Sequence, residues 1–105
     1  MNKRQYPESD WKLLRKKLPG WQEAYMERLV EEYRTLLDGA ESPSKKFWAL
    51  EKKISEDKRK VGVRARMSRS EMANIVFSLL EEGAITLADL EEFSKELQEA
   101  ASHIF

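Results

Sequence analysis

Several residue types are scarce in this chain, and each scarcity excludes a class of structure. The 105 residues include no cysteine, which excludes disulfides and thiolate metal sites and suits a reducing compartment. The four glycines are isolated, so no glycine-rich phosphate loop can form. A single histidine, His103, offers no second imidazole for a metal site. The longest apolar stretch, residues 72–80, is interrupted by Asn74 and Ser78 and is too short to span a bilayer.

The remaining composition is typical of one small folded domain over residues 1–105. Hydrophobic residues make up 41% of the chain, which is enough for one modest core at this length. No apolar segment follows the basic residues at the N-terminus, so no secretory signal is predicted. We therefore expect a cytoplasmic protein.

The charges cancel to zero overall but are sorted into blocks along the sequence. Residues 1–20 carry a net charge of +4, residues 21–44 carry −4, residues 45–69 carry +7 and residues 70–105 carry −7. A mixed surface would scatter both signs. The blocks should therefore pair with one another inside the fold, pair across a dimer, or face outside partners.

Two helices are expected before residue 40, with a break at Pro19-Gly20. Start signals near residues 7–10 predict a short leading helix within residues 1–20, and a proline disfavours helical geometry in the residue before it. A second helix should span about residues 21–37, apolar on one half of its surface and glutamate-rich on the other. Gly39 would end it in a left-handed conformation. The leading helix could lie on a membrane surface, but two turns favour packing on the core.

The third helix should open at Ser42-Pro43 and bury the stripe Phe47, Leu50 and Ile54. It should fade into a basic extended connector over residues 58–68, where apolar and basic residues alternate with a period of two. That alternation predicts a linker pressed on the core or, alternatively, an edge strand paired with a second copy.

A helical hairpin is expected over residues 69–105. Ser68-x-x-Glu71 has the pattern of a capping box for the fourth helix, which is apolar over more than half its circumference and should be central. Gly83 should end it, and Thr86-x-x-Asp89 should start the fifth helix. The expected fold class is all-α, a small bundle of four main helices plus the short leading helix.

The connector and the third helix supply the best candidate contact residues. Arg64 and Arg66 would share one side of an extended chain, which suits a run of phosphates or an acidic protein strip. Trp48 lies off the apolar stripe between lysines and could stack on a base, although the favoured interpretation is a rim residue of a wide core face. The full candidate set for a partner or nucleic acid is Lys45, Trp48, Lys52, Lys58, Arg59, Lys60, Arg64, Arg66 and Arg69.

Catalytic and DNA-reading arrangements are not favoured. A helix-turn-helix reader is disfavoured because the fifth helix carries five acidic residues against one lysine, and phosphates would repel it. His103 and the pair Glu91 and Glu92 are best interpreted as solvated surface residues. We expect no enzyme activity, catalytic residue, metal, cofactor, small-molecule ligand or membrane partner.

The segment from Leu79 to Leu90, Leu-Leu-Glu-Glu-Gly-Ala-Ile-Thr-Leu-Ala-Asp-Leu, resembles the short C-terminal helical hairpins called SHOCT domains. The front half, with Trp-Lys-Leu-Leu-Arg-Lys-Lys-Leu-Pro-Gly-Trp-Gln-Glu, resembles short uncharacterised bacterial proteins. The first resemblance implies association with other proteins or self-association, and the second implies a bacterial source.

These observations favour a binding protein that contacts another protein or a copy of itself as a homodimer. Phe77 on the fourth helix is the candidate protein interface if its side chain is exposed. The alternative is nucleic-acid binding through the connector and the third helix, which is less favoured because the basic run can pair with the acidic helices of the protein itself.

Overall fold

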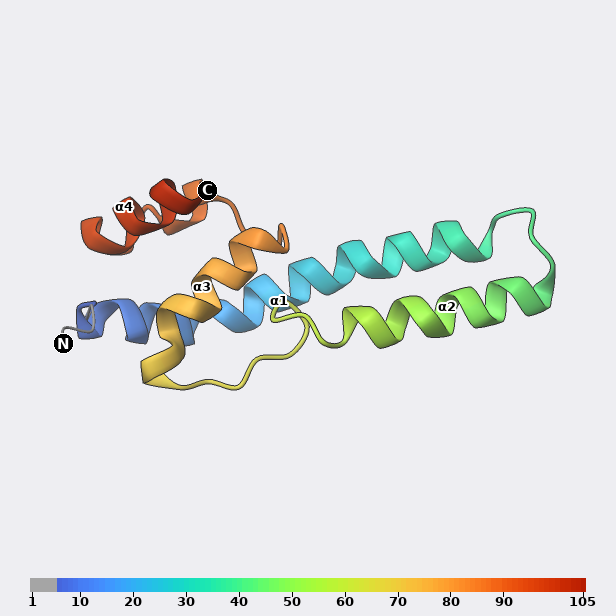
Figure 1. Ribbon diagram of the computed structural model, residues 1–105, viewed down its shortest axis with the longest axis horizontal. Coiled ribbons are helices and arrows are strands. Elements are labelled where there is room, and N and C mark those ends of the chain that lie inside the picture. The colour runs from blue at the N-terminus through green and yellow to red at the C-terminus, as the bar shows by residue number, and fades with distance from the viewer. Residues whose placement is uncertain (1–5) are drawn as a thin grey trace.

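The computed structural model describes residues 6–105, and every regular element within them is helical. The predicted all-α class and the small helical bundle are therefore confirmed (Figure 1). Lys3 and Arg4, which contribute to the first charge block, lie outside the described residues. The elements are α1 (Glu8–Leu37), α2 (Pro43–Asp57), the 3-10 turn η1 (Arg69–Glu71), α3 (Met72–Glu81), the 3-10 turn η2 (Leu87–Leu90) and α4 (Lys95–Ile104).

The predicted break at Pro19-Gly20 is wrong, because α1 runs through it as one helix of 30 residues. Proline inside a helix costs about 3 kcal/mol through its missing N–H and its ring. The helix continues because its buried stripe does not change direction at the proline. Apolar side chains follow the helical spacing on both sides of the proline, and the buried ones are Trp11, Leu14, Leu18, Tyr25 and Leu29.

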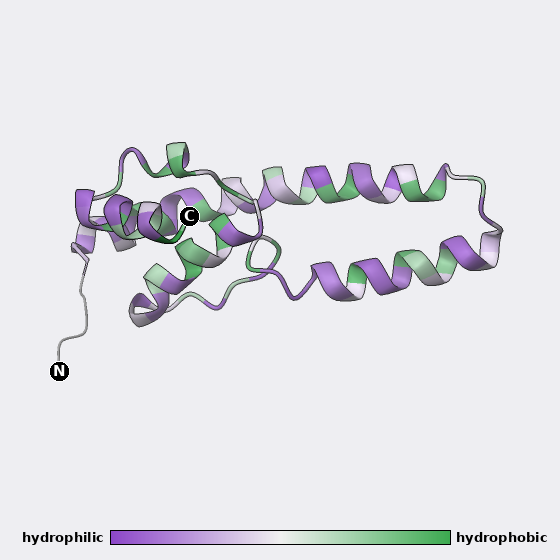
Figure 2. Cartoon of the chain, turned by 45° about the horizontal axis from the view of Figure 1, so that its top comes forward, coloured by the Kyte–Doolittle hydropathy of each residue, from purple (hydrophilic) through white to green (hydrophobic). Residues whose placement is uncertain are grey.

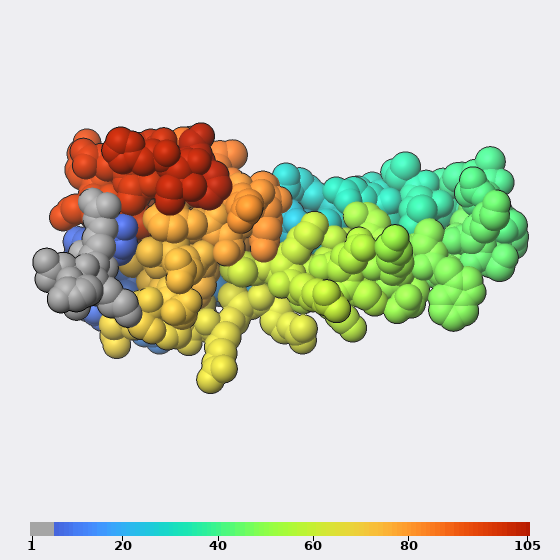
Figure 3. All heavy atoms as spheres, viewed as in Figure 1, coloured from blue at the N-terminus to red at the C-terminus, as the bar shows by residue number. Residues whose placement is uncertain are grey.

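The molecule has a packed body and a projecting arm, and its extents are 54 × 26 × 24 Å. Figure 1 shows α3 and α4 gathered around the first half of α1, while the second half of α1 extends away from them beside α2. We call residues 26–57, which comprise this second half and α2, the arm. The space-filling view shows the arm standing clear of the body (Figure 3).

The core lies in the body. α3 contributes four buried residues, Met72, Ile75, Val76 and Leu79, which confirms its predicted central position. They pack with the first half of α1 and with apolar residues around α4. In this setting the leading segment packs on the core, and the membrane-surface alternative is not observed. Hydrophobic burial in the body therefore anchors the first half of α1, and the second half extends beyond this core.

The starts of the last two helices differ from the predicted ones. The side chain of Ser68 does not cap a helix; η1 precedes α3, which begins at Met72. The capping box of Thr86 and Asp89 does form, but it opens the 3-10 turn η2. α4 begins later, at the side-chain cap of Ser94. The pattern identified the turn correctly but not the type of helix that follows it.

The first linker and the connector complete the fold. α2 begins at the cap of Ser42 as predicted, with the Lys45 amide donating to the Ser42 hydroxyl at 3.4 Å. Gly39 is not left-handed; among the described residues only Gly83 has a positive φ, 77°. Residues 58–63 form turns and residues 64–68 lack regular structure, so the edge strand is not observed in the described chain.

Candidate interaction surface

The arm carries large apolar side chains that the rest of the described chain, residues 6–105, leaves exposed. The only buried residue of α2 is Asp57, so the stripe that was expected to enter a core does not do so. Phe47 is 62% exposed and Ile54 is 41% exposed, while Val30 and Leu37 on α1 are 49% and 43% exposed. Figure 2 shows that hydrophobic segments continue along both arm helices beyond the body. An isolated pair of helices has little to stabilise it in water.

These side chains lie on one side of the arm. At 100° per residue, Met26, Val30 and Leu37 fall within about 60° of one another on α1, as do Phe47 and Ile54 with their neighbour Leu50 on α2. A shallow cavity of about 140 Å³ lies between the two stripes, with Met26, Val30 and Ile54 in its lining. We call this surface, made by Met26, Val30, Leu37, Phe47, Leu50 and Ile54, the arm face.

The opposite side of the arm is polar and is closed by ion pairs within the chain. The Lys53 ammonium lies 2.7 Å from a Glu32 carboxylate oxygen. The hydrogen bond to Glu32 raises the pKa of Lys53. The arm is therefore amphipathic across its width, with one side satisfied internally and one side left apolar and open.

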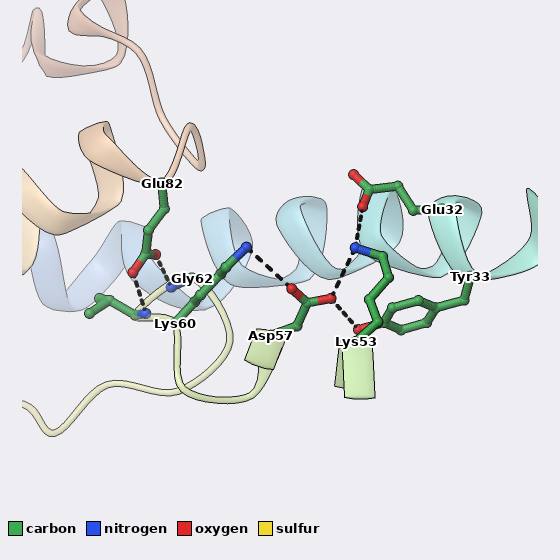
Figure 4. A network of polar contacts seen from close by, with 8 residues as sticks. Glu32, Tyr33, Lys53, Asp57, Lys60, Gly62 and Glu82 are labelled. Carbon is green, nitrogen blue, oxygen red and sulfur yellow. Dashed lines mark hydrogen bonds and ion pairs between the residues drawn. The ribbon is translucent and has the colours of Figure 1, made fainter. Parts of the chain in front are cut away.

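A buried carboxylate joins the two arm helices near the body (Figure 4). Asp57 is 3% exposed and accepts a hydrogen bond of 2.7 Å from the Tyr33 hydroxyl. The ammonium groups of Lys60 and Lys53 lie 3.2 Å and 3.5 Å from its oxygens. Burial alone would raise the pKa of Asp57, but the Tyr33 hydrogen bond and the two ammonium groups outweigh it and lower that pKa. Burial and the Asp57 anion together raise the pKa of Tyr33 to about 12.

The turns after α2 are attached to α1 and α3 by backbone contacts (Figure 4). The amides of Val61 and Gly62 both donate to the Glu82 carboxylate at 2.9 Å. A Cβ on Gly62 would collide with the ring of Tyr25, so only glycine permits this close approach. Gln22 also donates to the Val61 carbonyl at 2.9 Å. These contacts fix the base of the arm against the body.

The candidate residues on α2 share its outward side. Lys45, Trp48 and Lys52 follow one another at helical spacing, and all three are exposed. Trp48 is 63% exposed and meets Phe47 edge-on, with ring centroids 4.9 Å apart. Lys45 forms an ion pair of 3.5 Å with Glu41. This exposure does not support the interpretation of Trp48 as a rim residue of the core.

The cations of the connector divide into internal and outward-facing groups. Lys60 is bound to Asp57, and Arg69 donates to both carboxylate oxygens of Glu8 at 3.1 Å and 2.8 Å. Arg64 and Arg66 line an open groove of about 710 Å³ between the connector and α3, and they have no ion-pair partner among residues 6–105. Lys58 and Arg59 are exposed. Side chains of the connector stand out from the surface in Figure 3.

The structure also places Phe77 and His103. Phe77 is half-buried, and its ring lies 6.3 Å from that of Phe105, so the exposure on which its interface role depended is not found. His103 is exposed in the last turn of α4.

The arm face was missed because its residues have the sequence pattern of core residues. Phe47 and Ile54 follow the same spacing as a buried stripe, and periodicity does not reveal whether another element covers them. One signal was present: α1 carries a second apolar row beside its buried one, at residues 26, 30, 33 and 37, which is more than one neighbouring helix needs.

No protein-family model, curated protein or solved structure matches this chain. Across the described residues there is no group of three or more His, Cys, Asp or Glu side chains placed to hold a metal ion. In the same part of the chain, none of the helices combines the length and apolar character needed to cross a membrane.

Proposed function

We propose that this chain is a small non-enzymatic interaction protein that acts by protein–protein contact through the arm face. The observation that carries the proposal is the exposure of Val30, Leu37, Phe47 and Ile54 on one side of a projecting helix pair. A contiguous apolar surface of this kind marks an interaction site more often than scattered apolar residues do.

The ionisable side chains of the arm support a non-enzymatic function. Asp57 and Tyr33 have shifted pKa values and line the arm-face cavity, which is the usual reason to suspect a catalytic site. Their oxygens are bonded to each other, however, and Lys60 completes the pairing. The cavity of about 140 Å³ is also smaller than the roughly 300 Å³ of ordinary ligand pockets. Both groups are better interpreted as structural.

The setting that we propose is the cytoplasm of a bacterium. The absence of cysteine supports a reducing compartment, and the likeness of the front half to short bacterial proteins supports the source. The SHOCT-like hairpin adds a second reason to favour protein association.

Site-specific crosslinking in cells tests the proposed function. A photo-reactive phenylalanine analogue at Phe47 should give one reproducible crosslinked protein product. The same analogue at Thr35, which is exposed outside the arm face, should not give it. A failure of Phe47 to crosslink to any protein, including the chain itself, would remove the proposal.

Nucleic-acid binding is the second candidate, supported by the exposed row of Lys45, Trp48 and Lys52 and by the unpaired Arg64 and Arg66. An exposed aromatic between cations is suited to stacking on a base. Replacing Arg64 and Arg66 with Ala should lower the salt slope of any RNA or single-stranded DNA affinity by roughly 2, since each lost phosphate contact removes about 0.7–0.9. If the protein retains no nucleic acid at low salt, this candidate is excluded. It is also excluded if the salt slope of the affinity does not change in the double variant.

A further inference from the structure

We infer that the occupant of the arm face is a second copy of this chain, and that the two arms form a four-helix bundle. This inference rests on the proposed function and names its partner. It starts from the two apolar rows of α1 beyond the body. One row, with Tyr25 and Leu29, is buried. In the other row Val30 and Leu37 are exposed and Met26 is half-buried. A helix in a four-helix bundle contacts two neighbours and needs both rows.

A permanent partner would explain how α2 is stabilised, because contacts within one chain hold it only weakly. No apolar residue of α2 is buried within one chain, so little hydrophobic free energy holds it against α1. A transient partner would leave α2 in that condition whenever it dissociated. A second copy is always available at the concentration of the chain itself, and it would cover Phe47 and Ile54 in the resting protein.

The size of the arm face is sufficient for such a dimer. The 15 residues of α2 give a helix about 22 Å long, and two packed helices are about 20 Å wide. The planar footprint is therefore about 440 Å² per copy, to which the relief of the side chains adds, so the interface is near the lower end of the stable size range. The residues that define the face are all apolar and include the aromatic side chain of Phe47, as stable interfaces do at their cores.

The charges that border the arm face on one copy are complementary to the same charges on a second copy. At 100° per residue, Glu27 lies beside the face near the base of α1, and Arg34 lies beside it nearer the tip. Lys58, the residue that follows α2, borders the face near the base, and Glu51 on α2 lies farther out. A twofold axis along the arm places α1 of one copy on α2 of the other. Each charge then faces an opposite one, Glu27 with Lys58 and Arg34 with Glu51.

Sedimentation equilibrium of the full chain tests the inference. The expected mass is twice the 12.3 kDa of one chain. Phe47→Ser should weaken the dimer by roughly tenfold or more, because it removes the largest exposed apolar side chain of the arm face. Trp48→Ser is a matched control, since Trp48 is an adjacent aromatic of nearly equal exposure on the outward side of α2. A monomeric wild-type chain, or equal effects of the two substitutions, would overturn the inference.

Charge reversal tests the order of the helices. Glu27→Lys should weaken the dimer, and adding Lys58→Glu should restore it, which a general loss of folding would not do. A double variant no stronger than the single one would overturn the twofold arrangement. If Phe47 crosslinks in cells to a different protein while the purified chain is a monomer, the second copy is excluded and the proposed function still stands.

Discussion

The carboxylate of Asp10, in the first turn of α1, accepts two hydrogen bonds from Ser94, 84 positions later in the chain. The Ser94 amide donates at 2.8 Å and its hydroxyl at 2.5 Å. Ser94 in turn caps α4, since its hydroxyl oxygen accepts from the Leu97 amide at 3.2 Å. Asp10 is 1% exposed, so its charge is satisfied almost entirely by this one residue. The contact joins the start of α1 to the start of the last helix.

Asp10→Ala should destabilise the protein by about 1–3 kcal/mol, because it leaves the partly buried Ser94 amide without its acceptor. The measurement is chemical denaturation followed by circular dichroism. Glu8→Ala is the control, because Glu8 lies on the exposed surface of the same turn and contacts Arg69 there. Equal losses for Asp10→Ala and Glu8→Ala would contradict the structural role of Asp10.

Gly62→Ala and Gly20→Ala should change stability in opposite directions. A methyl group at Gly62 collides with the ring of Tyr25 and should cost about 1–3 kcal/mol, since the ring sits in packed surroundings. Gly20 lies inside α1 with no atom within 4 Å of an added Cβ. Alanine there should stabilise the protein by about 0.5–1 kcal/mol through its higher helix propensity. A loss of stability at both positions would contradict a continuous α1.

Much of the fold could be predicted from the sequence, because the periodicity of apolar residues identifies helices regardless of their packing. α2 begins at Ser42 as expected, and α3 supplies core residues as expected. The continuity of α1 was missed because the local cost of Pro19 was given more weight than the stripe that passes through it. Tertiary packing decides such conflicts, and the buried Leu18 and Tyr25 lie on either side of the proline.

The arm face could not be located from the sequence, because exposure depends on which elements are neighbours. The stripe containing Phe47 has the same spacing as the stripe that α4 buries around Leu97. The polar network was equally hidden. In the sequence, Asp57 is one of several charged residues in its helix. Only the fold brings Tyr33, 24 positions away, to its carboxylate.

Acid should remove the contribution of Asp57 to stability. Its pKa is lowered in the folded protein, so its stabilising effect is present above the unfolded value near 3.8 and is lost as the pH falls through the lower folded value. Asp57→Asn should therefore cost about 1–3 kcal/mol at neutral pH, and the difference from wild type should shrink below about pH 4. Glu56→Gln, at an exposed neighbour, is the control. A difference that stays constant into acid would contradict the network.

Tyr33 should ionise only at high pH, because burial and the Asp57 anion raise its pKa to about 12. Its stabilising effect is present below the unfolded value of 10.0 and is lost as the pH rises through the folded value. Ultraviolet titration of tyrosinate, with helicity recorded alongside, should show a component near pH 12 that Tyr33→Phe removes. Asp57→Asn should move this component to lower pH, since the neutral amide no longer opposes the phenolate. If Asp57→Asn leaves that component in place, Asp57 does not hold Tyr33, and the junction between α1 and α2 depends on packing alone.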